Sequence, residues 1–272
     1  MTDDITKTCG TCTSIFGNRN YLTLNKIKSL VGTGIEYLEI AALQQLHINL
    51  WNDAQVDELA KGIPDTGLKV WSIHAPFCSI AMDDPETRED GVRQLVKSAE
   101  VVKQFGGEVV VVHPGRDVPS KDRDRELQWT VEGMLKAIEQ YPPGIRLALE
   151  TMGAKGLAGP PEEMAWVLDR LPADRAGMCM DTGHTNLGYL VEEYIGKFPN
   201  RIFSVHLQDN NGEKDDHFLA GNGQLDWPPI LKALKAAGYT GPLMNEGGDP
   251  DLGPDECARR YVERMQGYIK SI

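Results

Sequence analysis

The feature that most constrains this sequence is a repeated alternation of short apolar runs with longer amphipathic stretches. Each run is too short for a buried helix and is rich in apolar residues without strict alternation, which is typical of a strand covered on both faces. The runs occupy Thr8–Ser14, Ile35–Ile40, Leu68–His74, Val109–His113, Ile145–Glu150, Gly177–Asp181, Ile202–Leu207 and Pro242–Glu246. The pattern therefore predicts about eight parallel strands.

The stretches between the runs carry apolar residues at spacings of three and four. In Glu86–Phe105, for example, Val92, Leu95, Val96 and Ala99 give the segment one apolar face. Glycines at positions 106, 144 and 238 follow three of these stretches, where a left-handed cap commonly ends a helix. The helices expected in this way are Asp53–Leu59, Glu86–Phe105, Glu126–Tyr141, Glu162–Leu171, Pro228–Ala237 and Asp255–Ile269.

The alternation of strand and helix predicts an α/β fold with a parallel sheet. Divided over eight units, 272 residues allow 34 residues for each strand, helix and pair of loops. This size suits a closed (β/α)8 barrel of the TIM type. An open doubly wound sheet is disfavoured because no glycine-rich phosphate-binding sequence follows the first run. We expect a single TIM-barrel domain over residues 1–272.

The composition excludes several classes of protein. The chain has 28 Lys or Arg and 40 Asp or Glu residues, for a formal net charge of −12, and such an acidic surface repels nucleic acids and anionic membranes. The one basic cluster, Lys121–Arg125, is interleaved with aspartates. No apolar run approaches the roughly 20 residues that span a bilayer. We therefore expect neither a nucleic-acid partner nor a membrane segment.

The cysteines and the N-terminus indicate a cytoplasmic protein. Five cysteines are an odd number in a chain too long to need disulfides, which suits reduced thiols. The spacing of Cys9 and Cys12 is that of a redox motif, but the rest of a thioredoxin pattern is missing, so we expect unpaired structural thiols. The first residues, Met1-Thr2-Asp3-Asp4, lack the basic and apolar regions of a secretory signal.

Polar residues end most of the predicted strands. Those at or close to the end of a run are His74, His113, Glu150, Asp181, His184, His206 and Glu246. Because the carboxyl ends of barrel strands open on one face, which holds the active site in such folds, these residues should converge. The loop after the seventh run adds Asp215 and His217, so that of the six histidines His47 alone lies outside the set.

The convergence of three carboxylates points to a cation. Each residue taken singly has an ordinary explanation, since a histidine there can be a half-buried core residue and Asp181 can cap the next helix. Together, Glu150, Asp181 and Glu246 would repel one another at a cost of several kcal/mol unless a cation neutralised them. Three carboxylates and one imidazole suit Mn2+ or Mg2+ best, with Co2+ or Zn2+ as alternatives. Glu39, near the end of the second run, is a candidate for a supporting or ion-pair role.

The motifs around these residues resemble one known superfamily. They read WSIHAPF, VVVVHPG, LALETMG, GMCMDTGHTNL, VHLQDNNG followed by DDHFLAGNG, and PLMNEGG, and they cover essentially the whole chain. As a set they resemble the xylose-isomerase-like TIM barrels. These include sugar and sugar-phosphate isomerases and epimerases, inosose dehydratase, and AP endonucleases of the endonuclease IV type. The resemblance implies a divalent metal and no organic cofactor.

By that resemblance, the expected metal ligands are Glu150, Asp181, His206 and Glu246. Glu150 and Glu246 would also act as the acid/base pair, and His184 would contact substrate. The endonuclease-type ligand positions have their residue types too, which leaves a second metal or a substrate-binding role open for His74, His113, His184, Asp215 and His217. Three aromatic residues in loops near the predicted mouth either wall a sugar or serve packing: Trp51, Phe77 and Trp227.

Two departures from the superfamily pattern stand out. The sequence has Gly221-Asn222-Gly223 where Gly-Glu-Gly is frequent. Ketose 3-epimerases place an arginine on the substrate shortly after the histidine of strand seven, whereas Lys214 is the one Lys or Arg between His206 and His217. The sequence therefore argues against a ketose 3-epimerase.

Three hypotheses use the predicted site. The first, which we favour, is an isomerase or epimerase of a small sugar or sugar phosphate, with two glutamates transferring protons next to a carbonyl through a metal-stabilised enediolate. The second is a dehydratase or lyase that begins with the same proton abstraction. The third is phosphodiester hydrolysis at abasic DNA by several metals, which the acidic charge disfavours. The sugar, the metal and the oligomeric state, including a homo-oligomer, stay open.

Overall fold

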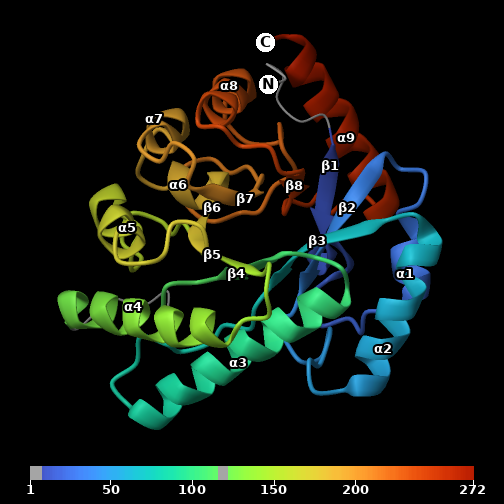
Figure 1. Ribbon diagram of the computed structural model, residues 1–272. Coiled ribbons are helices and arrows are strands. Elements are labelled where there is room, and N and C mark those ends of the chain that lie inside the picture. Colours follow the sequence, from blue (N-terminus) through green and yellow to red (C-terminus); the bar gives the residue numbers. More distant parts are fainter. Residues whose placement is uncertain (1–7, 116–121) are drawn as a thin grey trace.

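The computed structural model describes residues 8–115 and 122–272, and within them eight strands form one sheet (Figure 1). The strands are β1 (Cys9–Cys12), β2 (Ile35–Ala41), β3 (Lys69–His74), β4 (Val109–Val112), β5 (Arg146–Glu150), β6 (Ala176–Asp181), β7 (Ile202–His206) and β8 (Leu243–Asn245). Each strand overlaps one of the predicted runs, so the predicted strands are confirmed. Lys121, part of the predicted basic cluster, lies outside the described residues.

The sheet closes into a barrel. Its order is β7-β6-β5-β4-β3-β2-β1-β8, with parallel pairing between neighbours. The two outer strands meet just beyond β7, where Leu207 pairs in parallel with Asn245 of β8. The Leu207 N–H also donates to the carbonyl of Met244 at 2.8 Å. The predicted (β/α)8 barrel is confirmed, and the carboxyl ends of its strands open on one face.

Helices surround the barrel and lie between consecutive strands, and one further helix follows β8 (Figure 1). They are α1 (Leu24–Ser29), α2 (Asp53–Gly62), α3 (Pro85–Gln104), α4 (Arg123–Gln140), α5 (Pro161–Leu168), α6 (Thr182–Asn186), α7 (Val191–Gly196), α8 (Trp227–Ala236) and α9 (Pro254–Lys270). Every predicted helix is present, with ends that differ by at most three residues. The periodicity did not predict α1, α6 or α7, because helices of 5 or 6 residues are too short to show an apolar face.

Local sequence explains where the helices begin and end. Five helices begin after a side chain that accepts a hydrogen bond from the N–H three residues later: Thr23, Asn52, Asp84, Asp122 and Asp181. Gly106 and Gly238 follow α3 and α8 with φ angles of 80° and 79°. Glycine adopts this left-handed conformation without a steric penalty, and both helices therefore stop there.

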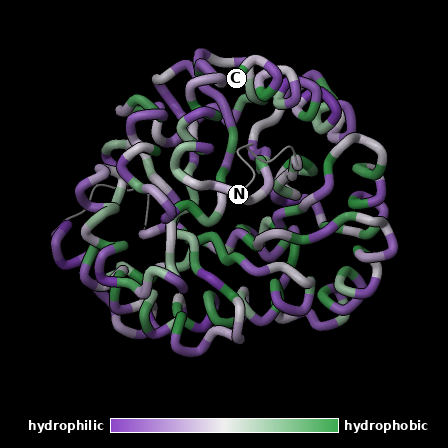
Figure 2. Tube along the Cα trace, turned by 45° about the horizontal axis from the view of Figure 1, so that its top comes forward, coloured by the Kyte–Doolittle hydropathy of each residue, from purple (hydrophilic) through white to green (hydrophobic). Residues whose placement is uncertain are grey.

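The barrel wall is apolar on both faces. In β4, Val110 and Val112 pack in the core between sheet and helices, whereas Val109 and Val111 belong to a separate inner cluster. Successive residues of a strand point to opposite sides, so this second set fills the barrel interior. The inner cluster also includes Ala148 and Cys179, with Trp71 and Phe203 packed against it. Figure 2 shows hydrophobic and hydrophilic residues alternating along the outer helices, as expected for helices with one buried face.

The cysteines and His47 also agree with the predictions from the sequence. The five cysteines are buried and free: Cys9, Cys12, Cys78, Cys179 and Cys257. His47 is a buried core histidine, whose ring nitrogens lie 2.6 Å from the Asn20 carbonyl and 3.2 Å from the Thr13 hydroxyl. Within the described residues, no helix combines the length and the apolar character that crossing a bilayer requires.

Candidate metal centre

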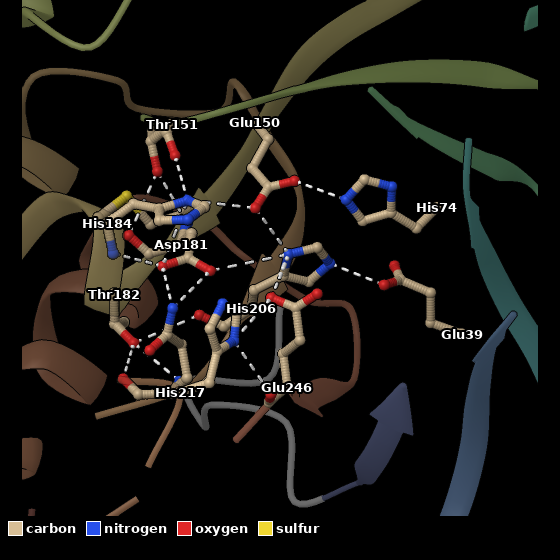
Figure 3. A network of polar contacts seen from close by, with 12 residues as sticks. Glu39, His74, Glu150, Thr151, Asp181, Thr182, His184, His206, His217 and Glu246 are labelled. Carbon is tan, nitrogen blue, oxygen red and sulfur yellow. Dashed lines mark hydrogen bonds and ion pairs between the residues drawn. The ribbon is translucent and has the colours of Figure 1, made fainter. Parts of the chain in front are cut away.

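Four acidic and imidazole side chains meet at the carboxyl ends of the strands (Figure 3). Glu150, Asp181 and His206 are the last residues of β5, β6 and β7, and Glu246 directly follows β8. None of these side chains is more than 6 % exposed. One ligand atom from each lies within 4.8 Å of those of the others. These residues, here called the strand-end cluster, are the four expected metal ligands.

His206 is held by hydrogen bonds behind the cluster. Its Nε2 lies 2.8 Å from Glu39 Oε1, and the Ser72 hydroxyl donates to Glu39 Oε2 at 2.7 Å. A register shift between β2 and β3 sets Ser72 opposite Glu39. The contact with Glu39 places a ring proton on Nε2 and turns Nδ1 toward Glu246 Oε2, 3.1 Å away. Glu39 therefore has the supporting position that carboxylates commonly take behind metal-binding histidines.

Glu150 is shared by several histidines. His74 Nε2 and His113 Nε2 lie 3.0 and 3.2 Å from its Oε2. On the other side, His184 Nδ1 and His206 Nδ1 lie 3.3 and 3.2 Å from its Oε1. His74, His113 and Glu150 also bring ligand atoms within 4.8 Å of one another. Glu150 thus belongs to two groups of a size that suits a metal ion.

A further group, here called the loop cluster, lies beside these residues and consists of His184, Asp215 and His217. Asp215 Oδ2 lies 3.2 Å from His184 Nε2 and 2.9 Å from His217 Nε2. His184 belongs to α6, and the other two come from the loop between β7 and α8. Burial would lower the pKa of His217, yet its hydrogen bond to Asp215 and the charge of Glu246 raise that pKa to about 9. His217 has a φ of 49°, which is uncommon for a residue other than glycine.

The buried charges of the strand-end cluster shift one another's pKa values. Burial opposes ionisation of Glu150, but the positive charges of His206 and His113 and hydrogen bonds from neighbouring histidines hold its pKa well below the ordinary range. Burial raises the pKa of Asp181 to about 7, and the charges of Glu150 and Glu246 add to this effect. Without a bound cation, the positive charge of the histidines therefore offsets the negative charge of the carboxylates, which a bound cation would otherwise neutralise.

The donor set fits a divalent cation. His206 Nδ1 lies 3.1 Å from Glu246 Oε2, and this oxygen is buried without a hydrogen-bond partner among the described residues. The ion pairs of Glu150, Asp181 and Glu246 with described residues all involve histidine. Three carboxylates and one imidazole nitrogen suit Mn2+ or Mg2+, and zinc accepts the same ligand types. The residues present therefore fit the expected metal.

A cavity of about 450 Å3 opens over both clusters. Glu150 and Glu246 line it, together with residues of the loops that follow β1 and β8. Phe77 also lines it and is 57 % exposed. Trp227 is buried at the start of α8, so it has the packing role, and Trp51 borders a separate groove along α3.

Two residues of the site were not predicted from the sequence. Gln208 is buried and its amide nitrogen donates to Asp215 Oδ1 at 2.8 Å and to Asp181 Oδ1 at 3.3 Å. The carbonyl of Thr151 lies 2.9 Å from His184 Nδ1. Both residues lie within two positions of a predicted ligand, and this proximity in the sequence was the one available signal.

Comparison with known proteins gives the same architecture. Residues 27–268 match the model of the xylose isomerase-like TIM barrel family. The chain belongs to this family. The match runs from before β2 to beyond β8 and therefore includes the whole strand-end cluster.

Proteins similar to this chain carry names that refer to different activities. A probable endonuclease 4 of Acholeplasma laidlawii is 31 % identical over 183 residues, which cover 60 % of this chain and 61 % of that protein. The structure of a D-tagatose 3-epimerase-like protein superposes with a TM-score of 0.83 at 22 % identity and covers 97 % of both chains. An IolI protein with a bound zinc atom superposes with a TM-score of 0.80 at 19 % identity, covering 95 % of this chain and 97 % of that one. At these identities the two structural likenesses show the fold.

Proposed function

We propose that this chain is a divalent-metal-dependent isomerase or epimerase that acts on a small sugar or sugar phosphate. The observation that carries the proposal is the placement of two glutamates, because Glu150 and Glu246 both belong to the strand-end cluster and both line the cavity. They come from β5 and from the end of β8, with β6 and β7 between them around the barrel. Two carboxylates that reach one substrate from different strands can remove a proton and return it, as an isomerase or epimerase requires.

The residues of the strand-end cluster have distinct roles in this proposal. Oxygens of Glu150, Asp181 and Glu246 and the Nδ1 atom of His206 would hold a divalent ion, which supplies a Lewis acid that polarises a substrate carbonyl. Burial opposes ionisation of Glu246, but the charge of His206 brings its pKa down to about 2, so that it is present as a base at neutral pH. Glu246 removes the proton beside the carbonyl and, in an isomerisation, returns it to the adjacent carbon. In an epimerisation, Glu150 would first take up a proton from solvent and then deliver it to the opposite face. His184 orients the substrate hydroxyls.

The cavity favours an uncharged substrate over a phosphorylated one. Among the described residues that line it, none is a lysine or arginine, so a distal phosphate would lack a basic partner there. Ser14, Asn18 and Asp249 supply polar groups instead, and Asn18 Oδ1 is buried without a hydrogen-bond partner among the described residues. Such groups suit sugar hydroxyls. Together with the net charge of −12, they support a small-molecule substrate rather than nucleic acid.

The test is metal analysis of the purified protein, followed by incubation with a panel of sugars and sugar phosphates in heavy water. We expect a bound divalent metal and deuterium on a carbon beside the carbonyl of at least one sugar, measured by NMR. Glu150→Gln and Glu246→Gln should abolish this exchange, whereas Glu108→Gln, which lies just before β4 at the other end of the barrel, should retain it. A metal-loaded protein without exchange on any member of the panel would contradict the proposal.

A second function, phosphoester hydrolysis, also has a specific observation in its favour. The His74, His113 and Glu150 group, the strand-end cluster and the loop cluster each bring their ligand atoms within 4.8 Å. Several ions held in this way would suit activation of water against a phosphodiester, and one relative is a probable endonuclease 4. Cleavage of abasic DNA without deuterium exchange would favour this second function. A dehydratase or lyase would instead show exchange together with loss of water or bond cleavage in the sugar.

A further inference from the structure

An amide side chain lies between the strand-end cluster and the loop cluster. Gln208 lies two residues beyond β7 and is fully buried. Its Nε2 donates to Asp215 Oδ1 at 2.8 Å and to Asp181 Oδ1 at 3.3 Å. Because Asp181 belongs to the strand-end cluster and Asp215 to the loop cluster, this one amide group contacts a carboxylate of each.

The backbone of Gln208 is fixed by contacts that do not involve the loop. Its N–H donates to Thr182 Oγ1 at 3.1 Å, and the Thr182 hydroxyl donates to the Gln208 carbonyl at 2.7 Å. Thr182 is the first residue of α6 and directly follows Asp181. The end of β6 and the start of α6 therefore determine where the amide group can lie.

The amide group occupies a space that a glycine leaves open. A Cβ atom at Gly183 would lie 2.2 Å from Cδ and Oε1 of Gln208, so any other residue there would displace the side chain. Gln208 Oε1 is also buried without a hydrogen-bond partner among the described residues, which is unfavourable for a buried oxygen. An apolar side chain could fill the same space without this buried oxygen, so packing alone does not account for an amide at this position.

The contact holds one oxygen of Asp215 and leaves the other oriented toward the loop cluster. Oδ1 accepts from Gln208, whereas Oδ2 lies 3.2 Å from His184 Nε2 and 2.9 Å from His217 Nε2. An uncharged donor achieves this without cancelling the negative charge that attracts a cation. Partners of this kind commonly change metal affinity by about 10- to 100-fold.

We propose that Gln208 is a positioning residue that aligns Asp215 for cation binding by the loop cluster and couples that cluster to Asp181. The proposal rests on the metal dependence in the proposed function, but it does not depend on the reaction. It predicts that the loop cluster binds an ion in addition to the one in the strand-end cluster, and that the affinity for this second ion depends on the amide group.

The test compares the full chain with two matched variants by calorimetric titration of the chelator-treated proteins with zinc. Gln208→Met keeps the length of the side chain but removes the donor. Gln55→Met removes an equally buried amide in α2, whose Nε2 donates to the carbonyls of Leu22 and His47 outside both clusters. We expect two or more ions in the unchanged protein and an affinity for the weaker ion that falls at least about tenfold in Gln208→Met. Gln55→Met should lower the melting temperature and leave both affinities unchanged.

Two further variants keep the test decisive if Gln208→Met folds poorly. Gln208→Asn retains an amide on a side chain that is one methylene shorter, and Gly183→Ala displaces the unchanged glutamine. Both variants should therefore lower the affinity for the same ion. Unchanged affinities in these variants, an equal loss in Gln55→Met, or a single ion in the unchanged protein would overturn the proposal. If the ions bind as expected but no sugar exchanges deuterium, the proposed function fails while the role of Gln208 stands.

Discussion

The strand-end cluster and the loop cluster use the same residue types on different supports. In the strand-end cluster, every side chain is at most 6 % exposed and comes from the end of a barrel strand. In the loop cluster, Asp215 and His217 are 33 % and 41 % exposed and come from a loop. Hydrogen bonds of the sheet fix the ligands of the strand-end cluster. The loop cluster instead depends on the left-handed backbone conformation of His217 and on the buried amide of Gln208.

Because the two clusters are supported differently, substitutions in them should differ in their energetic cost. A buried carboxylate that loses its partner retains an uncompensated charge in a medium that screens poorly, so substitutions in the strand-end cluster should have large effects. Partly exposed groups are screened by solvent, and each one contributes less. The comparison therefore predicts a gradient from the strand ends to the loop, and four experiments test it.

The largest effect should follow removal of Glu150, because this carboxylate contacts four histidines and belongs to two candidate ion groups. Glu150→Gln should slow deuterium exchange by about 10³-fold, in the range for loss of an acid–base group. The rate is measured by NMR alongside Asp215→Asn, which makes the same change in the loop cluster. An equal decrease of the exchange rate in the two variants would contradict the predicted difference between the clusters.

Metal removal should have the next largest effect. A cation present at 100 times its dissociation constant stabilises the folded chain by about 2.7 kcal/mol, which corresponds to about 5–10 °C for a protein of this size. Treatment with a chelator should lower the melting temperature by that amount, as measured by differential scanning calorimetry. Asp181→Asn should lose this metal-dependent shift and His217→Asn should keep most of it. The opposite pattern would place the stabilising ion in the loop cluster.

Glu39 should affect the strand-end cluster indirectly, through the orientation of His206. Glu39→Gln keeps a hydrogen-bond acceptor but removes the charge, and we expect metal affinity to fall by about 10- to 100-fold. Competition with a chromogenic chelator measures the affinity. Glu36→Gln on the same strand is the control, because Glu36 is exposed and should leave the affinity unchanged. An effect as small as that of the control would show that His206 does not need Glu39.

The smallest effect should come from His217. Asparagine accepts left-handed backbone better than most residues, so His217→Asn removes the imidazole with little backbone strain. We expect a loss of about tenfold in affinity for the weaker ion, and a KM that rises more than kcat falls. Steady-state kinetics and zinc titration provide both values. A larger loss than that in Glu39→Gln would reverse the order of the two clusters.

Much of the fold could be predicted from the sequence because its signals are local. The run Val109–His113 is apolar on both faces, and β4 follows it closely. The helices missed by periodicity, such as α6, are too short to have a face. In the site, Glu150 ends an apolar run and His206 lies near the end of another, which made both candidate site residues, and the family resemblance then implied that they are metal ligands. Gln208 was not, because an amide two residues later in a loop has no periodic or chemical signature of its own.

The sequence by itself determined the eight-fold alternation and the polar residues at the strand ends, since both depend on side chains a few residues apart. The tertiary structure alone decided which atoms face one another. The bond between His206 and Glu39 joins residues 167 positions apart and depends on the closure of the barrel and on the shift in register between β2 and β3. The position of Asp215 likewise depends on the space beside Gly183 that Gln208 occupies. Contacts of this kind arise from backbone geometry across many elements, which no local pattern of residues encodes.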